Sequence, residues 1–376
     1  MLIKTLLLFT RTPLHIGAGG SVGAIDQPIQ RERHTGFPFV SASALKGGFV
    51  DFFLESQPIL DANGQPTGKR RLSRSTSGRW LFGPEPGEDD HFAGALQFGD
   101  ARLLAFPVRS AKGSFAWITC PLILRRAARE GVIPRALVGT LQEVEDDKAL
   151  FLTGDAASQV CLTRKQKQKI QENGREVEKE EIIHEVVLEE YTFRNSGGLP
   201  DLTTPTTPPT TQNLGQALAL LFADDEVWRE IAPRLVVLSD GMMSFFAQNA
   251  CEIAQHVRIS DETGTAEHGG LFNQENVPSE TLFYSMLNVF GGRGAFAGKD
   301  EFKADQAFKK FSEELAAHSV CQFGGDATTG LGYCTIRIFT PLERTPATQI
   351  DGTSEKLPVQ ATPTPVSTPA TPGGAQ

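Results

Sequence analysis

The sequence predicts an α+β fold, because a strand begins the chain and a helix, a glycine-rich loop and a strand end its folded part. Residues 2–10 alternate and are rich in Leu, Ile, Thr and Phe, which is typical of a strand. A helix capped by Ser41 or Ser43 is expected next. An amphipathic helix from Phe302 to Leu315 precedes the loop GGDATTGLG and the strand YCTIRIFT. This order predicts a ferredoxin-like core, which also underlies RNA-recognition domains, although their aromatic stacking signature is absent here.

Between these ends, short apolar runs alternate with polar segments. Strands are expected within 95–106 and 115–124, whereas the polar, basic residues 61–79 predict a mobile loop. The mixed-charge segment 161–190 predicts a solvated hairpin or helix pair. The threonines and prolines of 203–211 predict a linker, since they cannot build a core.

The second half of the sequence adds a buried strand, a hairpin and a tail. LVVLSD at 235–240 predicts the strand, and a helix follows it. Residues 252–276 predict a hairpin, because Val257 and Ile259 alternate with polar neighbours and SDETGT forms the turn. From residue 341 the chain is rich in Pro and Thr, so 341–376 is expected to be disordered.

Composition restricts the class of protein. The chain has 376 residues and a hydrophobic fraction of 40%, which suffices for a large core. No apolar run reaches the length of about 18 residues that a membrane span needs, so no membrane association is expected. The five cysteines are scattered and form no CxxC pair, which favours a reducing cytoplasm over a disulfide framework or a zinc ribbon.

The charge is unevenly distributed. The formal net charge is -9, but residues 1–80 carry ten Lys or Arg against five Asp or Glu. Because screening limits exposed charges to a reach of about 10 Å, a basic N-terminal face can bind a polyanion on an acidic protein.

The segment 14–47 holds the residues with the clearest chemical potential. Asp26 lies between a glycine-rich loop and a basic cluster, where one carboxylate can hold a divalent metal completed by water and phosphate. A turn aspartate that caps its own backbone is the commoner interpretation. His15 can act as an acid or base, or pack at a strand end.

Two further segments favour anion binding. SASALKG at 41–47 predicts a helix N-terminus with hydroxyl groups and Lys46 in the first turn, although a plain N-cap with a solvated lysine is equally compatible. The loop 324–332 has four glycines that allow close approach of a polynucleotide backbone, but it matches neither a Walker A nor a Rossmann pattern. On glycine content alone, a flexible helix-to-strand turn is the favoured interpretation.

Three stretches together resemble the RAMP superfamily of CRISPR proteins. They are LHIGAG…GAIDQPIQRERHTGFPFVSASALKG, VRISDETGTAEHGGLFNQENVPSETLFYS and QFGGDATTGLG, and they occur in the family's order. The resemblance is strongest to the backbone subunit of the type III-B (Cmr) effector complex, which cleaves target RNA. It covers roughly residues 1–340, which is compatible with one extended domain.

The resemblance implies a hand-like architecture. A ferredoxin-like (RRM-like) palm with helical insertions carries the crRNA, and the hairpin at about 252–278 is a thumb that intrudes between guide and target. The charged insertion at about 161–211 and the tail are particular to this chain. Expected partners are crRNA, single-stranded target RNA, further copies of the chain in a filament and the other subunits of the complex.

The resemblance also implies residue roles. Asp26 is the expected catalytic residue and the ligand of a divalent metal, Mg²⁺ or Mn²⁺, with His15 and Glu275 as helpers. The expected RNA-binding residues are Ser43, Lys46, Arg31, Arg33, His256, Arg258, Gly324, Gly325, Thr329, Gly330 and Gly332. The implied reaction is attack of a 2′-hydroxyl on the adjacent phosphate at regular intervals, once per subunit, where the thumb turns a nucleotide out.

Two alternatives stay open at this point. A non-catalytic subunit that coats crRNA would use Asp26 only as a turn residue. A stand-alone crRNA-processing nuclease would act without metal, but the stretches specific to the type III-B branch argue against it.

Overall fold

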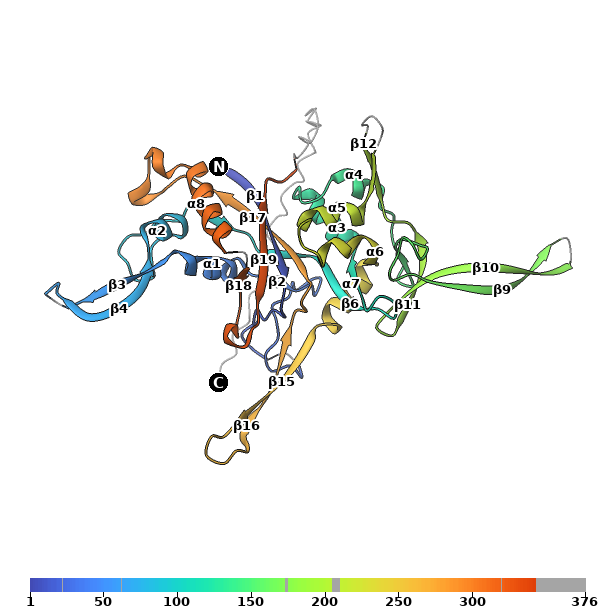
Figure 1. Cartoon of the computed structure of the whole chain (residues 1–376), viewed down its shortest axis with the longest axis horizontal. Helices are drawn as coiled ribbons and strands as arrows, with labels where there is room; N and C mark the ends of the chain where they lie inside the picture. Colours follow the sequence, from blue (N-terminus) through green and yellow to red (C-terminus); the bar gives the residue numbers. More distant parts are fainter. Residues whose placement is uncertain (22, 62, 173–174, 205–209, 319, 343–376) are drawn as a thin grey trace, which may run out of the picture. The chain divides into compact units, whose positions relative to one another are not determined.

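The computed structural model describes residues 1–21, 23–61, 63–172, 175–204, 210–318 and 320–342. Met1–Glu343 forms one compact unit that combines helices with a large mixed sheet (Figure 1), which confirms the predicted α+β class. The sheet contains 13 strands. In spatial order its main path is β18 (Val320–Gln322), β19 (Tyr333–Phe339), β1 (Leu2–Thr10), β17 (Leu282–Val289), β6 (Ala101–Arg109), β7 (Phe115–Thr119), β14 (Leu235–Val237), β8 (Lys148–Leu150), β11 (Tyr191–Gly197), β10 (Arg175–Leu188) and β9 (Leu162–Glu172), with β2 (Phe39–Val40) paired to β6 and β5 (Leu96–Phe98) to β17.

Helices pack on this sheet, and three separate two-stranded hairpins complete the described fold. The α-helices are α1 (Ala42–Val50), α2 (Thr76–Phe82), α3 (Pro121–Arg129), α4 (Arg135–Gly139), α5 (Leu214–Ala219), α6 (Ile231–Arg234), α7 (Asp240–Asn249) and α8 (Ala304–Ala317). The 3-10 turns are η1 (Asp51–Phe53), η2 (Leu220–Phe222), η3 (Trp228–Glu230), η4 (Gly294–Phe296), η5 (Asp300–Phe302) and η6 (Ala327–Thr329). The hairpins are β3 (Leu54–Leu60) with β4 (Pro66–Arg74), β12 (Asp201–Thr204) with β13 (Thr210–Asn213), and β15 (Glu252–Ile259) with β16 (Ala266–Asn276).

Four antiparallel strands form the part of the sheet that supports the candidate site. β1 pairs with β17 on one side and β19 on the other, and β6 continues the sheet beyond β17. The two helices α1 and α8 pack together through Phe49 and Phe311, whose ring centroids are 5.2 Å apart. Phe323, directly after β18, lies 5.1 Å from Phe49, so the glycine loop begins against α1.

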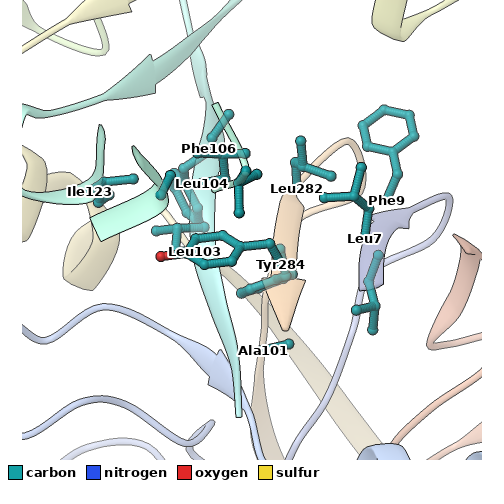
Figure 2. Packing of buried hydrophobic residues seen from close by; sticks show 14 of the residues in the cluster. Leu7, Phe9, Ala101, Leu103, Leu104, Phe106, Ile123, Leu282 and Tyr284 are labelled. Carbon is teal, nitrogen blue, oxygen red and sulfur yellow. The ribbon is translucent and has the colours of Figure 1, made fainter. Parts of the chain in front are cut away.

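The core covers both faces of this sheet. Consecutive residues of a strand point to opposite faces, yet Leu7 and Leu8 are both fully buried. Phe9 packs against Phe222 and Trp228 from the helical region around α5. Figure 2 shows β1, β6 and β17 contributing neighbouring apolar side chains, which fix the strands that carry the site.

Several predicted elements are present. β1, α1, β14, α7, α8 and β19 lie where the sequence predicted them, and the hairpin expected within 252–276 is β15–β16. Of the two options for 161–190, the hairpin is the one found, as β9–β10, and Figure 1 shows it extending away from the helices.

Two local predictions were wrong. Residues 61–79 do not form one mobile loop, because Pro66–Arg74 pairs with β3 and α2 begins at Thr76 with Ser75 as its side-chain cap. The second expected strand ends at Thr119, where Pro121 starts α3; proline is well suited to the first turn of a helix.

Parts of two predicted segments cannot be compared with the structure. In the expected linker 203–211, residues 205–209 lie outside the described residues, as does the expected tail from residue 343 onward. Within the described part of the chain, no helix has the length and apolarity needed to cross a membrane.

Candidate nucleic-acid interface and cleavage site

The loop that carries Asp26 runs beside the end of β16. The Gln27 N–H group donates to the carbonyl oxygen of Asn273 at 3.1 Å, and the Glu275 N–H group donates to that of Gln27 at 2.9 Å. The two segments therefore form a short parallel bridge between Gln27 and Gln274. This pairing places Asp26 at the root of the β15–β16 hairpin.

Asn273 fixes Asp26 through the backbone and the side chain. The Asn273 N–H group donates to Oδ2 of Asp26 at 2.9 Å, and Oδ1 of Asn273 accepts from the Asp26 N–H group at 2.8 Å. The Asn273 amide also donates to the carbonyl oxygen of Ala24 at 2.9 Å. Asp26 is exposed, and its Oδ1 has no hydrogen-bond partner among the described residues. The site therefore presents one oriented carboxylate oxygen to solvent.

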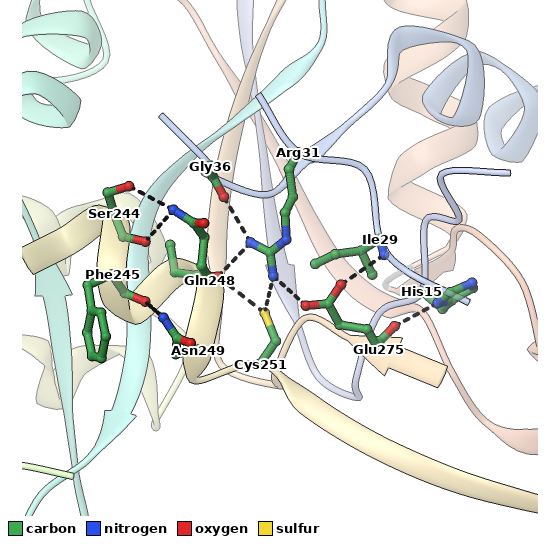
Figure 3. A network of polar contacts seen from close by, with 11 residues as sticks. His15, Ile29, Arg31, Gly36, Ser244, Phe245, Gln248, Asn249, Cys251 and Glu275 are labelled. Carbon is green, nitrogen blue, oxygen red and sulfur yellow. Dashed lines mark hydrogen bonds and ion pairs between the residues drawn. The ribbon is translucent and has the colours of Figure 1, made fainter. Parts of the chain in front are cut away.

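Glu275 lies inside the protein beneath this loop (Figure 3). Its Oε1 accepts from Nη2 of Arg31 at 2.5 Å, and its Oε2 accepts from the Ile29 N–H group at 3.1 Å. Only 4% of the Glu275 side chain is exposed. Both carboxylate oxygens have protein partners, and these contacts hold the loop in place; the helper role in catalysis expected for Glu275 stays a prediction.

Arg31 is also engaged within the protein. Its Nη1 donates to the carbonyl oxygens of Gly36 at 2.8 Å and Ala247 at 2.6 Å, and its Nη2 also contacts Sγ of Cys251 at 3.3 Å. Burial acts to lower the pKa of Arg31, but the Cys251 sulfur and the Glu275 carboxylate outweigh it and the pKa is raised. Arg31 therefore clamps the loop to α7 and β16, and these contacts leave it little capacity for the RNA contact expected from the sequence.

His15 connects the Asp26 region with the glycine loop. Its Nδ1 lies 2.7 Å from the carbonyl oxygen of Glu275, which can only accept, so Nδ1 carries the hydrogen. Nε2 has no hydrogen-bond partner among the described residues, and the side chain is buried. The His15 carbonyl oxygen accepts from the Gly325 N–H group at 3.1 Å.

Two of the four loop glycines are required by packing. A Cβ atom at Gly324 would lie 2.2 Å from the His15 carbonyl oxygen, and one at Gly332 would lie 1.9 Å from that of Phe323. Both residues also have positive φ. In contrast, a Cβ at Gly330 would meet nothing within 4 Å, and Gly325 would meet only the edge of His15. The surface open to a ligand is therefore the middle of the loop.

This open part of the loop is tied to the hairpin root. Nε2 of Gln274 donates to Oδ2 of Asp326 at 2.8 Å, while Thr329 Oγ1 donates to the Asp326 carbonyl oxygen at 2.9 Å. Three consecutive residues of β16 therefore each hold a different part of the site. Asn273 holds Asp26, Gln274 holds the glycine loop through Asp326, and Glu275 holds Arg31. Sequence reasoning missed Asn273, Gln274 and Asp326, because their roles depend on contacts across long sequence separations.

The start of α1 differs from the expected anion site. Oδ1 of Asp100 accepts from the Ala42 N–H group at 2.8 Å, and the Ser43 hydroxyl donates to Oγ of Ser41 at 3.1 Å. The first free N–H group of the helix is therefore already paired with an acid. Burial, together with the nearby Arg74, lowers the pKa of Lys46. Because the Ala42 N–H group is occupied, Lys46 is the stronger candidate on α1 for a phosphate contact.

The remaining expected RNA contacts lie on separate surfaces. His256 stacks on Phe272 with ring centroids 5.0 Å apart, and Arg258 is exposed and forms a 3.7 Å ion pair with Glu267. Arg33 is exposed and has no ion-pair or hydrogen-bond partner among the described residues. The β15–β16 hairpin also exposes apolar side chains, namely Ile253, Val257, Ile259 and Leu271.

The donor set around Asp26 limits what metal it could hold. The described residues contain no group of three or more His, Cys, Asp or Glu side chains arranged for a metal. Asp26 offers one free oxygen, while Glu275 is occupied by Arg31 and Ile29. This set fits a hard cation such as Mg²⁺ held mainly by water and substrate phosphate, and does not fit a protein-only cage.

Comparison with known protein families identifies the class of protein. The family model of the RAMP superfamily matches residues 8–335 of this chain. The chain belongs to the RAMP superfamily.

Particular relatives have similar sequences along most of their length. The Cmr endoribonuclease Cmr4 of Pyrococcus furiosus is 29% identical over 334 residues, which cover 88% of this chain and 94% of the relative. The CMR subunit Cmr4 of Saccharolobus solfataricus is 23% identical over 318 residues, or 77% of this chain and 85% of the relative.

Solved structures share the fold. Oligomeric Cmr4 from Pyrococcus furiosus aligns with a TM-score of 0.52 at 24% identity, covering 90% of this chain and 98% of that one. A chain of the type III-B Cmr-beta complex bound to cognate target RNA aligns with a TM-score of 0.55 at 18% identity, covering 90% of this chain and 97% of that one.

Proposed function

We propose that this chain is the crRNA-binding backbone subunit of a type III-B CRISPR effector complex and cleaves complementary target RNA. The observation that carries the proposal is the exposed Asp26 carboxylate, held at the root of the β15–β16 hairpin by Asn273. The similarity to a relative named as an endoribonuclease over 88% of the chain supports it. The cytoplasm is the corresponding location.

The palm of this subunit is a ferredoxin-like unit. Its strands are β1, β6, β17 and β19, which lie in the antiparallel order β19-β1-β17-β6. This is the order of a βαββαβ unit in which α1 connects β1 to β6 and α8 connects β17 to β19. The contact between Phe49 and Phe311 places the two helices together, as that arrangement requires.

The guide and the target occupy different sides of the site. Lys46 on α1 and the open middle of the glycine loop contact guide phosphates, and Arg33 adds positive charge. The β15–β16 hairpin is the thumb: its exposed apolar side chains and the His256–Phe272 stack separate neighbouring nucleotides. Further copies of the chain continue along the same crRNA, and guide pairing determines which target is bound.

Cleavage takes place next to Asp26. The 2′-hydroxyl of the turned-out nucleotide gives up its proton as its oxygen attacks the adjacent phosphorus, the bond from phosphorus to the 5′-oxygen breaks, and the 5′-oxygen takes up a proton, so that no net proton is consumed. The products are a 2′,3′-cyclic phosphate and a 5′-hydroxyl. When bound, Mg²⁺ or Mn²⁺ supplies positive charge that stabilises the phosphorane and the leaving oxygen. Asp26 orients the reacting groups. Nε2 of His15 is the candidate for transferring a proton to or from the reacting oxygens.

The substitution Asp26→Asn tests whether the Asp26 charge is needed for cleavage without removing the contact that holds the loop. Asparagine keeps an oxygen that can accept from the Asn273 N–H group but removes the charge. We expect the reconstituted complex to bind guide and target normally and to lose target cleavage. The matched control is Asp155→Asn, which changes an exposed loop aspartate paired with Lys112 at 2.8 Å. Normal cleavage by the complex with Asp26→Asn would show that Asp26 is not required for the reaction and serves as a turn residue.

Metal dependence is tested with the same complex. Chelation by EDTA is expected to stop target cleavage without releasing the guide, and Mg²⁺ or Mn²⁺ is expected to restore it. Cleavage that persists in EDTA would contradict the metal-assisted reaction.

A further inference from the structure

A cavity of about 700 Å³ lies between α1, the end of β4 and the loop that follows α2. Ser43 and Lys46 line it from α1, and Arg74 lines it from β4. Phe92 and Phe98 also line it. A volume of this size is typical of sites for small organic ligands. None of the cleavage residues around Asp26 lines this cavity.

The charges in the cavity leave Lys46 without a counter-ion. Lys46 forms no ion pair or hydrogen bond with the described residues, although burial and nearby Arg74 lower its pKa. The lining acids are held away from Lys46: Glu88 forms a 2.8 Å ion pair with Arg79, and Glu85 accepts a hydrogen bond from the backbone N–H group of Arg74. An anion at Lys46 would offset both the burial and the like charge. Ser43 lies one helical turn before Lys46 and adds a hydroxyl group on the same face.

The aromatic side of the cavity is preformed. Phe98 stacks on Phe49 with centroids 5.4 Å apart, and Phe92 packs edge-on against Phe296 at 5.8 Å. Phe92 and Phe98 are both only partly buried, so they retain surface for a ligand.

Close backbone contacts with α2 hold the middle of this wall. The Ala95 N–H group donates to the Trp80 carbonyl oxygen at 3.0 Å. A Cβ atom at Gly94 would lie 2.4 Å from the Leu81 carbonyl oxygen, so only glycine allows this close approach.

We propose that this cavity binds one nucleotide of the guide RNA, with its phosphate at Lys46 and Ser43 and its base against Phe92 and Phe98. Every base has a π face, so stacking on phenylalanine tolerates any guide sequence. The inference rests on the proposed function only in that the guide strand passes along α1. It adds a base-binding site apart from the thumb, which holds each subunit in register with the guide.

Photocrosslinking tests the location directly. A guide RNA carrying 4-thiouridine at successive positions is assembled with the full complex, irradiated and analysed by peptide mass spectrometry. We expect one guide position per subunit to crosslink within residues 82–98. Crosslinks confined to the thumb, or no guide position that crosslinks within residues 82–98, would overturn the inference.

A pair of variants tests the stacking. Phe92→Leu keeps an apolar side chain and removes the ring, and Phe115→Leu is the control because Phe115 is a half-buried phenylalanine next to Trp117, outside the cavity. Removing the base at the crosslinked position is expected to weaken guide binding by roughly tenfold in the wild-type and control proteins, but little in Phe92→Leu. An equal loss in all three proteins would refute stacking on Phe92.

The two proposals fail in different ways. A complex that cleaves target at regular sites but gives no crosslink within 82–98 contradicts only the cavity. A chain that binds no guide contradicts both.

Discussion

Replacing Glu275 with alanine should destabilise the protein strongly, because the change leaves Arg31 without its carboxylate partner. The Glu275 and Arg31 side chains are 4% and 19% exposed, and their contact distance is 2.5 Å. Removing one partner of a buried ion pair costs about 3–5 kcal/mol. The Ile29 N–H group loses its acceptor in the same substitution. Since a folded domain is stable by only about 5–15 kcal/mol, the expected loss is a large fraction of the total.

The assay is urea denaturation followed by circular dichroism, with the wild type and two controls. Glu275→Gln keeps one acceptor oxygen, which can serve either the Ile29 N–H group or Arg31 but not both, so its midpoint should fall between those of the wild type and Glu275→Ala. Glu267→Ala breaks an exposed 3.7 Å pair with Arg258. Such a surface pair contributes only about 0–1 kcal/mol. If Glu275→Ala and Glu267→Ala lowered the free energy of unfolding equally, the buried clamp would be refuted.

Three further predictions follow from the same contacts. Burial, with Asp225 nearby, raises the pKa of Glu280 to about 7 from 4.5, so the stability from its protonation is present below pH 4.5 and lost as the pH rises through 7. The stability of Glu280→Gln relative to the wild type should therefore be greater above pH 7 than below pH 4.5. A difference in urea midpoint between the two proteins that is the same at both pH values would contradict this. Gly332→Ala should prevent folding or lower the free energy of unfolding far more than Gly330→Ala, because only the Cβ at residue 332 would meet backbone, 1.9 Å from the Phe323 carbonyl oxygen. Similar melting temperatures for the two variants would be inconsistent with that packing. Asn273→Ala should slow target cleavage by roughly 10²-fold with guide affinity unchanged, since it loosens Asp26; an unchanged cleavage rate would argue against this positioning.

Local sequence patterns predicted the strands, helices and turns whose signals lie within a few consecutive residues. The apolar composition of β1 and the turn of the β15–β16 hairpin are local signals, and both elements are present, although β1 is buried on both faces and does not alternate. The β3–β4 hairpin was missed because β4 is mostly exposed and basic, so it lacks the alternation that marks a half-buried strand.

The candidate site was predictable in part. Asp26, Lys46 and the glycine loop were singled out from the sequence, and the structure places Asp26 at the hairpin root. It could not be predicted that Arg31 binds Glu275, or that Gly324 and Gly332 are needed for packing against His15 and Phe323. These contacts join residues far apart in the chain, and a single sequence contains no record of them.

The most direct test of the central claim maps target-RNA products from the complete complex in Mg²⁺, with the wild-type subunit and with Asp26→Asn. The account predicts wild-type fragments separated by a constant interval, each ending in a 2′,3′-cyclic phosphate, and intact target with the variant despite normal binding. Regularly spaced fragments from the Asp26→Asn complex would contradict it.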